Sequence, residues 1–214
     1  MGPPNTLYNP EAGSHPLPAD EREVKAVLRA GVRCYRSHPY FAERYGARGE
    51  AFTRSDGGYL ATLVAHPQSY VDNQIEWLTV VLASRGMPRW LMEIHLDLLC
   101  EELSAALPRR AGRYKKLRRA AQHLRTRRLA WISEADFVAL TAFFEARAGA
   151  GLRGAGGLLV AAVCDECCGL TKAVPSLISW LADPGRFSPA WCAAVAETLD
   201  RARAMAKPRA GVSS

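Results

Sequence analysis

The chain has 214 residues, of which 49% are hydrophobic and 23% are charged, and its formal net charge is +7. This composition supplies enough apolar residues for a core and excludes an intrinsically disordered chain. The sequence has no apolar run of about 18 residues and no signal-peptide pattern, which excludes a membrane-spanning helix and leads us to expect a soluble cytoplasmic protein.

The first expected elements follow a proline-rich segment. Residues 1–19 contain five prolines and are expected to form a flexible N-terminal arm. Asp20 can cap a first helix, which should end before Pro39 because the residue preceding a proline disfavours the helical conformation. A short helix over 40–45 and a longer one over 49–65 should follow, with a glycine between them.

Two stretches, 56–107 and 157–206, show the same order of signals. Each has a glycine pair, a Trp-Leu in its middle and a helix start that combines proline with tryptophan. The paired positions are Gly57-Gly58 with Gly156-Gly157, Trp77 with Trp180, and Trp90 with Trp191. The helices expected in the first stretch are 59–65, 70–85 and 88–107, and those in the second are 158–174, 176–182 and 189–206.

The interval between these stretches is expected to hold a basic helix over 114–129, a helix over 134–147 that Ser133 caps, and a glycine-rich loop over 148–157. No strand or hairpin signal is convincing. The sequence therefore predicts an all-α helical bundle of two pseudo-repeated halves joined by a basic helix. The predicted division is an arm over 1–19, halves over 20–108 and 131–206, a basic connector over 109–130, and a tail over 207–214.

Helical periodicity predicts the core. The expected core residues are Leu60, Ile75, Trp77, Leu78, Trp90, Ile94, Leu98, Phe137, Phe144, Leu159, Leu177, Trp180 and Trp191. Glu93, Asp97 and Glu101 form a row at i,i+4 spacing, which is typical of a solvated helix face.

The positive charge is concentrated in one segment that contains no acidic residue. Its ten cations are Arg109, Arg110, Arg113, Lys115, Lys116, Arg118, Arg119, Arg125, Arg127 and Arg128. Without them the formal charge of the chain would be about −3, from +7 less 10. The charges surround the expected helix, and only Tyr114 could stack on a base. An acidic protein partner is the first interpretation, and nucleic acid or the acidic remainder of this chain are the alternatives.

Charge reversal at four of these residues is the test that the sequence suggests. Reversal at Arg118, Arg119, Arg127 and Arg128 should abolish binding and leave the thermal midpoint nearly unchanged if the whole segment is a working surface.

Three cysteines are candidate metal ligands. On a helix Cys164, Cys167 and Cys168 share one face, so their thiolates could bind zinc, or a pair could undergo redox chemistry. The alternative is that these cysteines pack as small residues where helices cross, which the frequent burial of cysteine favours.

Part of the first half resembles a known family. Its residues are Arg44-Tyr45-Gly46-Ala47-Arg48-Gly49, Asp56-Gly57-Gly58-Tyr59-Leu60, Trp77-Leu78 and Ser84-Arg85-Gly86-Met87-Pro88. Over residues 43–107 these motifs resemble the helical domain that precedes cobalamin-binding domains in bacterial regulators, and more distantly the globin-like phycobiliproteins. The resemblance implies a sensory or regulatory domain. Phe52 stands where phycobiliproteins have the cysteine that attaches bilin, which argues against covalent attachment, and the second half has no cobalamin-type histidine motif.

A globin-like fold would make His95 a candidate haem ligand, although a lone helical histidine is more often structural. No sequence motif for a nucleotide loop, a catalytic serine or a zinc protease is present. We therefore expect a non-enzymatic regulatory or partner-binding protein that uses the basic helix. The alternatives are a sensor that binds a tetrapyrrole, another small molecule or a metal, and an accessory subunit of an enzyme.

Overall fold

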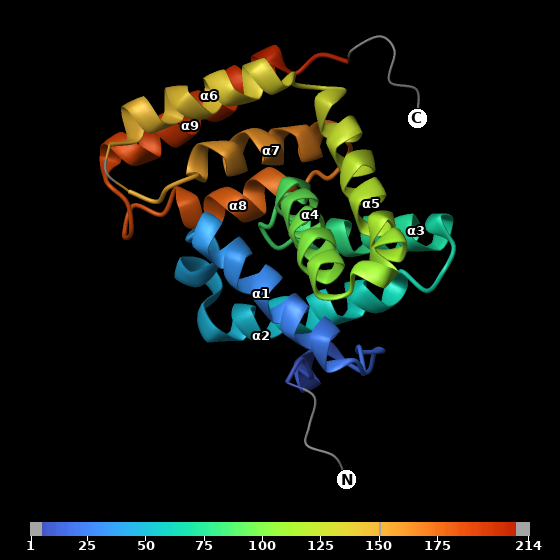
Figure 1. Ribbon diagram of the computed structural model, residues 1–214. Coiled ribbons are helices and arrows are strands. Elements are labelled where there is room, and N and C mark those ends of the chain that lie inside the picture. Colours follow the sequence, from blue (N-terminus) through green and yellow to red (C-terminus); the bar gives the residue numbers. More distant parts are fainter. Residues whose placement is uncertain (1–5, 150, 209–214) are drawn as a thin grey trace. The chain divides into compact units, whose positions relative to one another are not determined.

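A computed structural model of the chain describes residues 6–149 and 151–208, and within these ranges it contains helices and turns but no strand (Figure 1). The α-helices are α1 (Glu21–Ser37), α2 (Tyr40–Leu63), α3 (Gln68–Ala83), α4 (Arg89–Ala106), α5 (Ala111–Leu129), α6 (Glu134–Ala148), α7 (Ala155–Cys167), α8 (Ala173–Leu181) and α9 (Pro189–Met205). Short 3-10 helices are η1 (Pro10–Ala12) and η2 (Pro108–Arg110). The predicted all-α fold class is confirmed.

Local sequence signals explain several helix ends. Asp20 accepts a hydrogen bond from the backbone N–H of Arg22 and caps α1, and Ser133 caps α6 through the N–H of Asp136. Gly46 has φ 55° and breaks α2 where the sequence predicted a separation. None of the described helices combines the length and the apolar content that crossing a membrane requires.

The described chain divides into two compact units, whose boundaries differ from the predicted halves. The first unit contains the described residues up to Glu76 together with Glu93–Ala121, and the second contains Trp77–Met92 with the described residues from Gln122 onward. Residues 77–92 were assigned to the first half, but they belong to the second unit. The basic connector over 109–130 is not a separate element, because its helix contributes to both units.

In the first unit, α1 packs on α2 where small residues allow a close approach. A Cβ atom added to Gly57 would lie 2.9 Å from Val27, and one added to Gly58 would lie 2.8 Å from Leu17 and 3.0 Å from Leu7. Leu7 and Leu17, which belong to the predicted flexible arm, therefore lie against α2, and the flexibility of residues 6–19 stays a prediction. Residues 1–5 of that predicted arm lie outside the described residues.

Polar contacts hold this N-terminal segment on α2. Glu11 forms an ion pair with Arg48 at 2.7 Å, and the ring of His15 contacts the hydroxyl of Ser55 at 2.9 Å. Leu7 is buried because its side chain fills the space that glycine leaves on α2. We call residues 7–18 the N-terminal strap.

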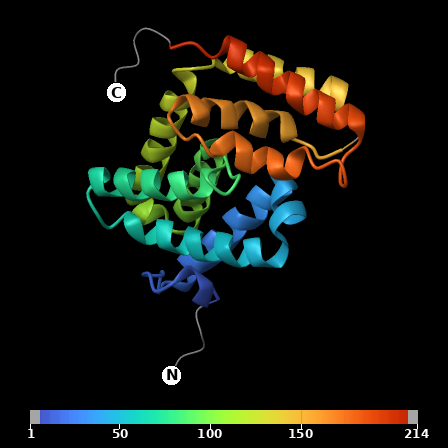
Figure 2. The ribbon, with the colours of Figure 1, turned by 180° about the vertical axis from the view of Figure 1, so that it is seen from behind.

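In the second unit, α6 and α9 form one layer that lies over α7 and α8 (Figure 2). The first turn of α7 lies close to α6, since a Cβ atom on Gly156 would come within 2.9 Å of the carbonyl oxygen of Thr141. Trp191 is buried, and its indole N–H donates to the carbonyl of Leu181 at 2.8 Å. The glycine-rich loop is shorter than predicted, because α7 already begins at residue 155.

Eight predicted core residues are buried. They are Leu60, Ile75, Leu78, Phe137, Phe144, Leu159, Leu177 and Trp191. The prediction is wrong for Trp77, which is 60% exposed. The remaining four predicted core residues are half-buried, and they are Trp90, Ile94, Leu98 and Trp180. In α4 the buried stripe instead follows Met92, Leu96, Leu99 and Leu103, and Glu93 is buried although the sequence placed it on a solvated face.

The positions that suggested a repeat differ in their surroundings. Gly57 lies inside α2, whereas its counterpart Gly156 lies in the first turn of α7. Trp77 is exposed, whereas its counterpart Trp180 is half-buried. The pseudo-repeat stays a prediction.

Candidate partner-binding surface on the basic segment

One face of α5 is buried, so its cations do not surround the helix as the sequence suggested. Tyr114, Leu117, Ala121, Leu124 and Arg128 lie at the three- and four-residue spacing of one helix face, and all of them are buried. The other cations of the segment must therefore be assigned one by one, by what each side chain contacts.

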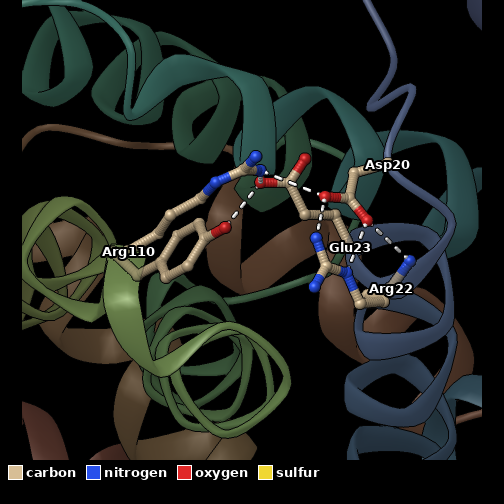
Figure 3. Close-up of polar contacts among 5 residues, drawn as sticks. Asp20, Arg22, Glu23 and Arg110 are labelled. Atoms are coloured by element: carbon tan, nitrogen blue, oxygen red, sulfur yellow. Dashed lines mark hydrogen bonds and ion pairs between the residues drawn. The ribbon is translucent and has the colours of Figure 1, made fainter.

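Arg110 contacts the beginning of α1 (Figure 3), and Tyr114 contacts the same turn. The guanidinium of Arg110 lies 3.2 Å from the carboxylate of Asp20 and 3.5 Å from that of Glu23, and the hydroxyl of Tyr114 donates to Glu23. Burial, and then the Glu23 carboxylate, raise the pKa of Tyr114 to about 12. Hydrogen bonds from Arg22, with a smaller contribution from Arg110, lower the pKa of Asp20 to about 2. Arg110 therefore has a structural role.

Lys116 and Arg118 also contact the first unit. The Lys116 ammonium donates to the carbonyls of Val64 and His66, just beyond the end of α2, where a cation satisfies free backbone acceptors. Arg118 lies 3.7 Å from Asp97 on α4. Both residues were predicted to bind a partner, but the structure gives them contacts within the chain.

Arg128 is buried in the second unit and is not available to a partner. Its side chain is 6% exposed and forms an ion pair with Glu134 at 3.1 Å. Its guanidinium carbon lies 4.7 Å from the centre of the Phe137 ring, in a cation–π contact. Arg125 is exposed and Arg127 is half-buried in the same unit.

Four cations of the first unit are exposed and form no ion pair with any part of the chain that the structure describes: Arg109, Arg113, Lys115 and Arg119. We call these residues the exposed cationic set. Lys115 and Arg119 lie one turn apart on the outer face of α5. Arg113 lies in the first turn of α5 and Arg109 lies in η2 directly before it, where the helix dipole is already positive and no acidic residue occupies the first turn.

The spacing of apolar residues in the sequence could have shown which cations lie on the buried face of α5 and which lie on its exposed face. Leu117, Ala121 and Leu124 recur every three to four residues, and the next position of that series is Arg128. The same series places Lys115 and Arg119 on the opposite face. The contacts of Lys116 could not have been found in this way, because they involve backbone atoms far away in the sequence.

The three candidate cysteines do not form a metal site. Cys164 is buried, and Cys167 and Cys168 are half-buried. In residues 6–149 and 151–208 no group of three or more His, Cys, Asp or Glu side chains is placed to bind a metal ion. Burial raises the pKa of Cys164, and burial with the neighbouring Cys168 and Glu166 raises that of Cys167. Raised thiol pKa values disfavour the thiolate that zinc binding or redox chemistry requires.

The acidic residues of the same motif have clear structural contacts. Asp165 is buried and accepts a hydrogen bond from the backbone of Arg89 at the start of α4. Glu166 forms a two-pronged ion pair with Arg203 on α9, with N···O distances of 2.8 and 2.9 Å. These contacts fit the interpretation in which the cysteines are small packing residues between helices.

His95 is packed against α2 instead of facing a space for a ligand. A Cβ atom on Gly57 would lie 3.4 Å from its Nε2 atom, and neither ring nitrogen has a hydrogen-bond partner among the described residues. Burial lowers the pKa of His95 to about 4, so the ring is neutral at pH 7. This geometry does not support the predicted haem or tetrapyrrole ligation.

Comparison with known proteins finds no matching family model, no matching curated protein and no matching solved structure. The resemblance of residues 43–107 to a bacterial sensory domain stays a prediction.

Proposed function

We propose that this chain is a non-enzymatic partner-binding protein, and that the exposed cationic set binds an acidic segment of another protein. The observation that carries the proposal is that Arg109, Arg113, Lys115 and Arg119 are exposed and form no ion pair within the described chain. Other cations of the same segment do find partners, as Arg110, Arg118 and Arg128 show.

The cations of this set that lie near the start of α5 destabilise this helix, and no ion pair with a described residue offsets that effect. Cations near a helix N-terminus oppose the helix dipole, each by about 0.3–1 kcal/mol. Acidic residues occupy this position in α1 and α6, but α5 begins without one. A bound carboxylate would interact favourably both with the cations and with the dipole.

An acidic protein segment fits this surface better than nucleic acid does. The aromatic ring of the segment, Tyr114, is buried and contacts Glu23, so it cannot stack on a base. The proposed partner therefore recognises charge alone, and its binding should weaken as salt screens the exposed pairs.

The test measures the fluorescence anisotropy of a labelled oligoglutamate peptide with the double variant K115E/R119E. The matched control is K172E/K207E, which makes the same change in net charge at two exposed residues of the second unit. At about 1 kcal/mol for each lost contact, K115E/R119E should weaken binding at least about tenfold, and the control should change it less than about twofold.

Two outcomes would overturn the proposal. Equal losses in the two double variants would show that only net charge matters. If duplex DNA of similar length bound more tightly than the peptide and lost affinity in K115E/R119E, nucleic acid would be the partner instead.

A further inference from the structure

The outer face of α6 and α9 in the second unit contains an open, mostly apolar hollow of about 440 Å³. It is lined by Ala139, Leu140, Phe143, Arg201, Ala204 and Met205. Met205, one of its apolar lining residues, is 42% exposed. We call it the α6–α9 hollow.

Two guanidinium groups lie over one aromatic ring of the hollow. The guanidinium carbon of Arg201 is 4.0 Å from the centre of the Phe143 ring, and that of Arg147 is 4.9 Å from it. Both cations are therefore attracted to the same ring.

Within residues 6–149 and 151–208, an ion pair is found for one of these cations and not for the other. Arg147 forms an ion pair with Glu197 at 3.1 Å. Arg201 is exposed and forms no ion pair with any described residue. Its sequence neighbour Asp200 acts electrostatically on Arg203, three residues further along α9. A net positive charge therefore remains at the edge of an exposed apolar surface.

We infer that the α6–α9 hollow is a docking site for an acidic amphipathic helix of a protein partner. Apolar side chains of that helix occupy the hollow between Ala139 and Ala204, and a carboxylate of the helix pairs with Arg201. This mode of recognition places an apolar helix face in a groove and charged residues at its edge. It is separate from the exposed cationic set, which belongs to the other unit.

The charge of the hollow and the contacts of its aromatic ring favour an acidic helix over a second copy of this chain and over a nucleic acid. In a symmetric dimer built on this face, the same patch would meet itself, so the net positive charge of one copy would face that of the other. A single-stranded nucleic acid would gain from a free aromatic face on which a base could stack, but the Phe143 ring already contacts two guanidinium groups. An acidic helix meets neither obstacle.

The experiment uses the full chain and a synthetic helical peptide that has leucines on one face and glutamates on the other. A second peptide with serine in place of each leucine tests the apolar contribution. Burying a leucine contributes about 1.5–3 kcal/mol, so the serine peptide should bind at least about tenfold more weakly. The chain carries K115E/R119E in all measurements, so that binding to the exposed cationic set is weakened equally in each of them.

Two pairs of variants locate the site. R201E should weaken binding of the leucine peptide at least about tenfold, and K172E, with the same change in charge, less than about twofold. A139W should fill the hollow and reduce binding, whereas A142W places the same ring on an exposed residue of α6 that does not line it. Equal binding of the two peptides, equal effects within either pair, or self-association of the chain that R201E abolishes would overturn the inference.

Discussion

The carboxylate of Asp165 on α7 accepts a hydrogen bond from the backbone N–H of Arg89, the first residue of α4, at an N···O distance of 2.9 Å. Its other oxygen lies 3.8 Å from Nε of the same arginine, and both side chains are less than a tenth exposed. One buried side chain of α7 thus satisfies a backbone N–H in the first turn of α4 and balances the charge of the first residue of that helix.

Asp165→Ala should therefore be among the most destabilising substitutions in the chain. Removing one partner of a buried ion pair leaves the other charge buried and costs about 3–5 kcal/mol. The neighbouring Glu166→Ala should cost at most about 1 kcal/mol, because its pair with Arg203 is partly exposed. Urea unfolding followed by circular dichroism checks the comparison, and equal costs would contradict it.

Arg128→Glu should lower the stability of the fold by about 3 kcal/mol or more, since it places a carboxylate at a buried position beside Glu134. Arg119→Glu is the control and should change stability by no more than about 0.5 kcal/mol, because that residue is exposed. Thermal unfolding separates the two variants. The sequence alone predicted a nearly unchanged thermal midpoint when Arg118, Arg119, Arg127 and Arg128 are all reversed. Because Arg128 is buried, we now expect the thermal midpoint of that variant to fall markedly.

His95 should make the fold sensitive to acid. Burial lowers its pKa from the ordinary 6.5 to about 4, so between these values the unfolded chain binds a proton that the folded chain does not. The stabilising effect of the neutral ring is complete above pH 6.5 and is lost as the pH falls toward 4, by up to about 3 kcal/mol.

His95→Leu should remove this part of the pH dependence, and urea unfolding at several pH values between 7 and 4 measures it. His123→Gln serves as the control at an exposed histidine of α5 and should keep the wild-type slope. An unchanged slope in His95→Leu would show that the ring is not buried as a neutral group.

Two glycine-to-alanine substitutions should have opposite effects. A Cβ atom on Gly156 would lie 2.9 Å from the carbonyl oxygen and 3.1 Å from the Cα atom of Thr141, which are backbone atoms that cannot move aside cheaply. We expect a loss of about 1–3 kcal/mol. Nothing lies within 4 Å of the same atom on Gly112, so Gly112→Ala should stabilise α5 by up to about 1 kcal/mol. The denaturant midpoint should fall for Gly156→Ala and rise for Gly112→Ala.

Much of the helical fold could be predicted because its signals are local. Asp20 and Ser133 cap the helices that the sequence assigned to them, and Gly46 breaks α2 where expected. The register of α4 could not be predicted in the same way. Apolar residues occur on most sides of that helix, so periodicity does not decide between Ile94 and Leu96 as the buried residue.

The sequence alone shows which cations belong to the candidate surface, but it does not show which groups they contact. All ten cations are visible in the sequence, but their roles depend on groups that are distant along the chain. Arg110 contacts an acidic residue 90 positions earlier, and Lys116 contacts carbonyls about 50 positions earlier. Partners so far away leave no trace in local periodicity, because chain folding alone brings them together.

The packing of the N-terminal strap over Gly58 has a practical consequence. A shortened version that began at α1 would expose to solvent the apolar surface that Leu7 and Leu17 cover, and it would be prone to aggregate. A version of this protein shortened for crystallisation should therefore keep residues 7–18.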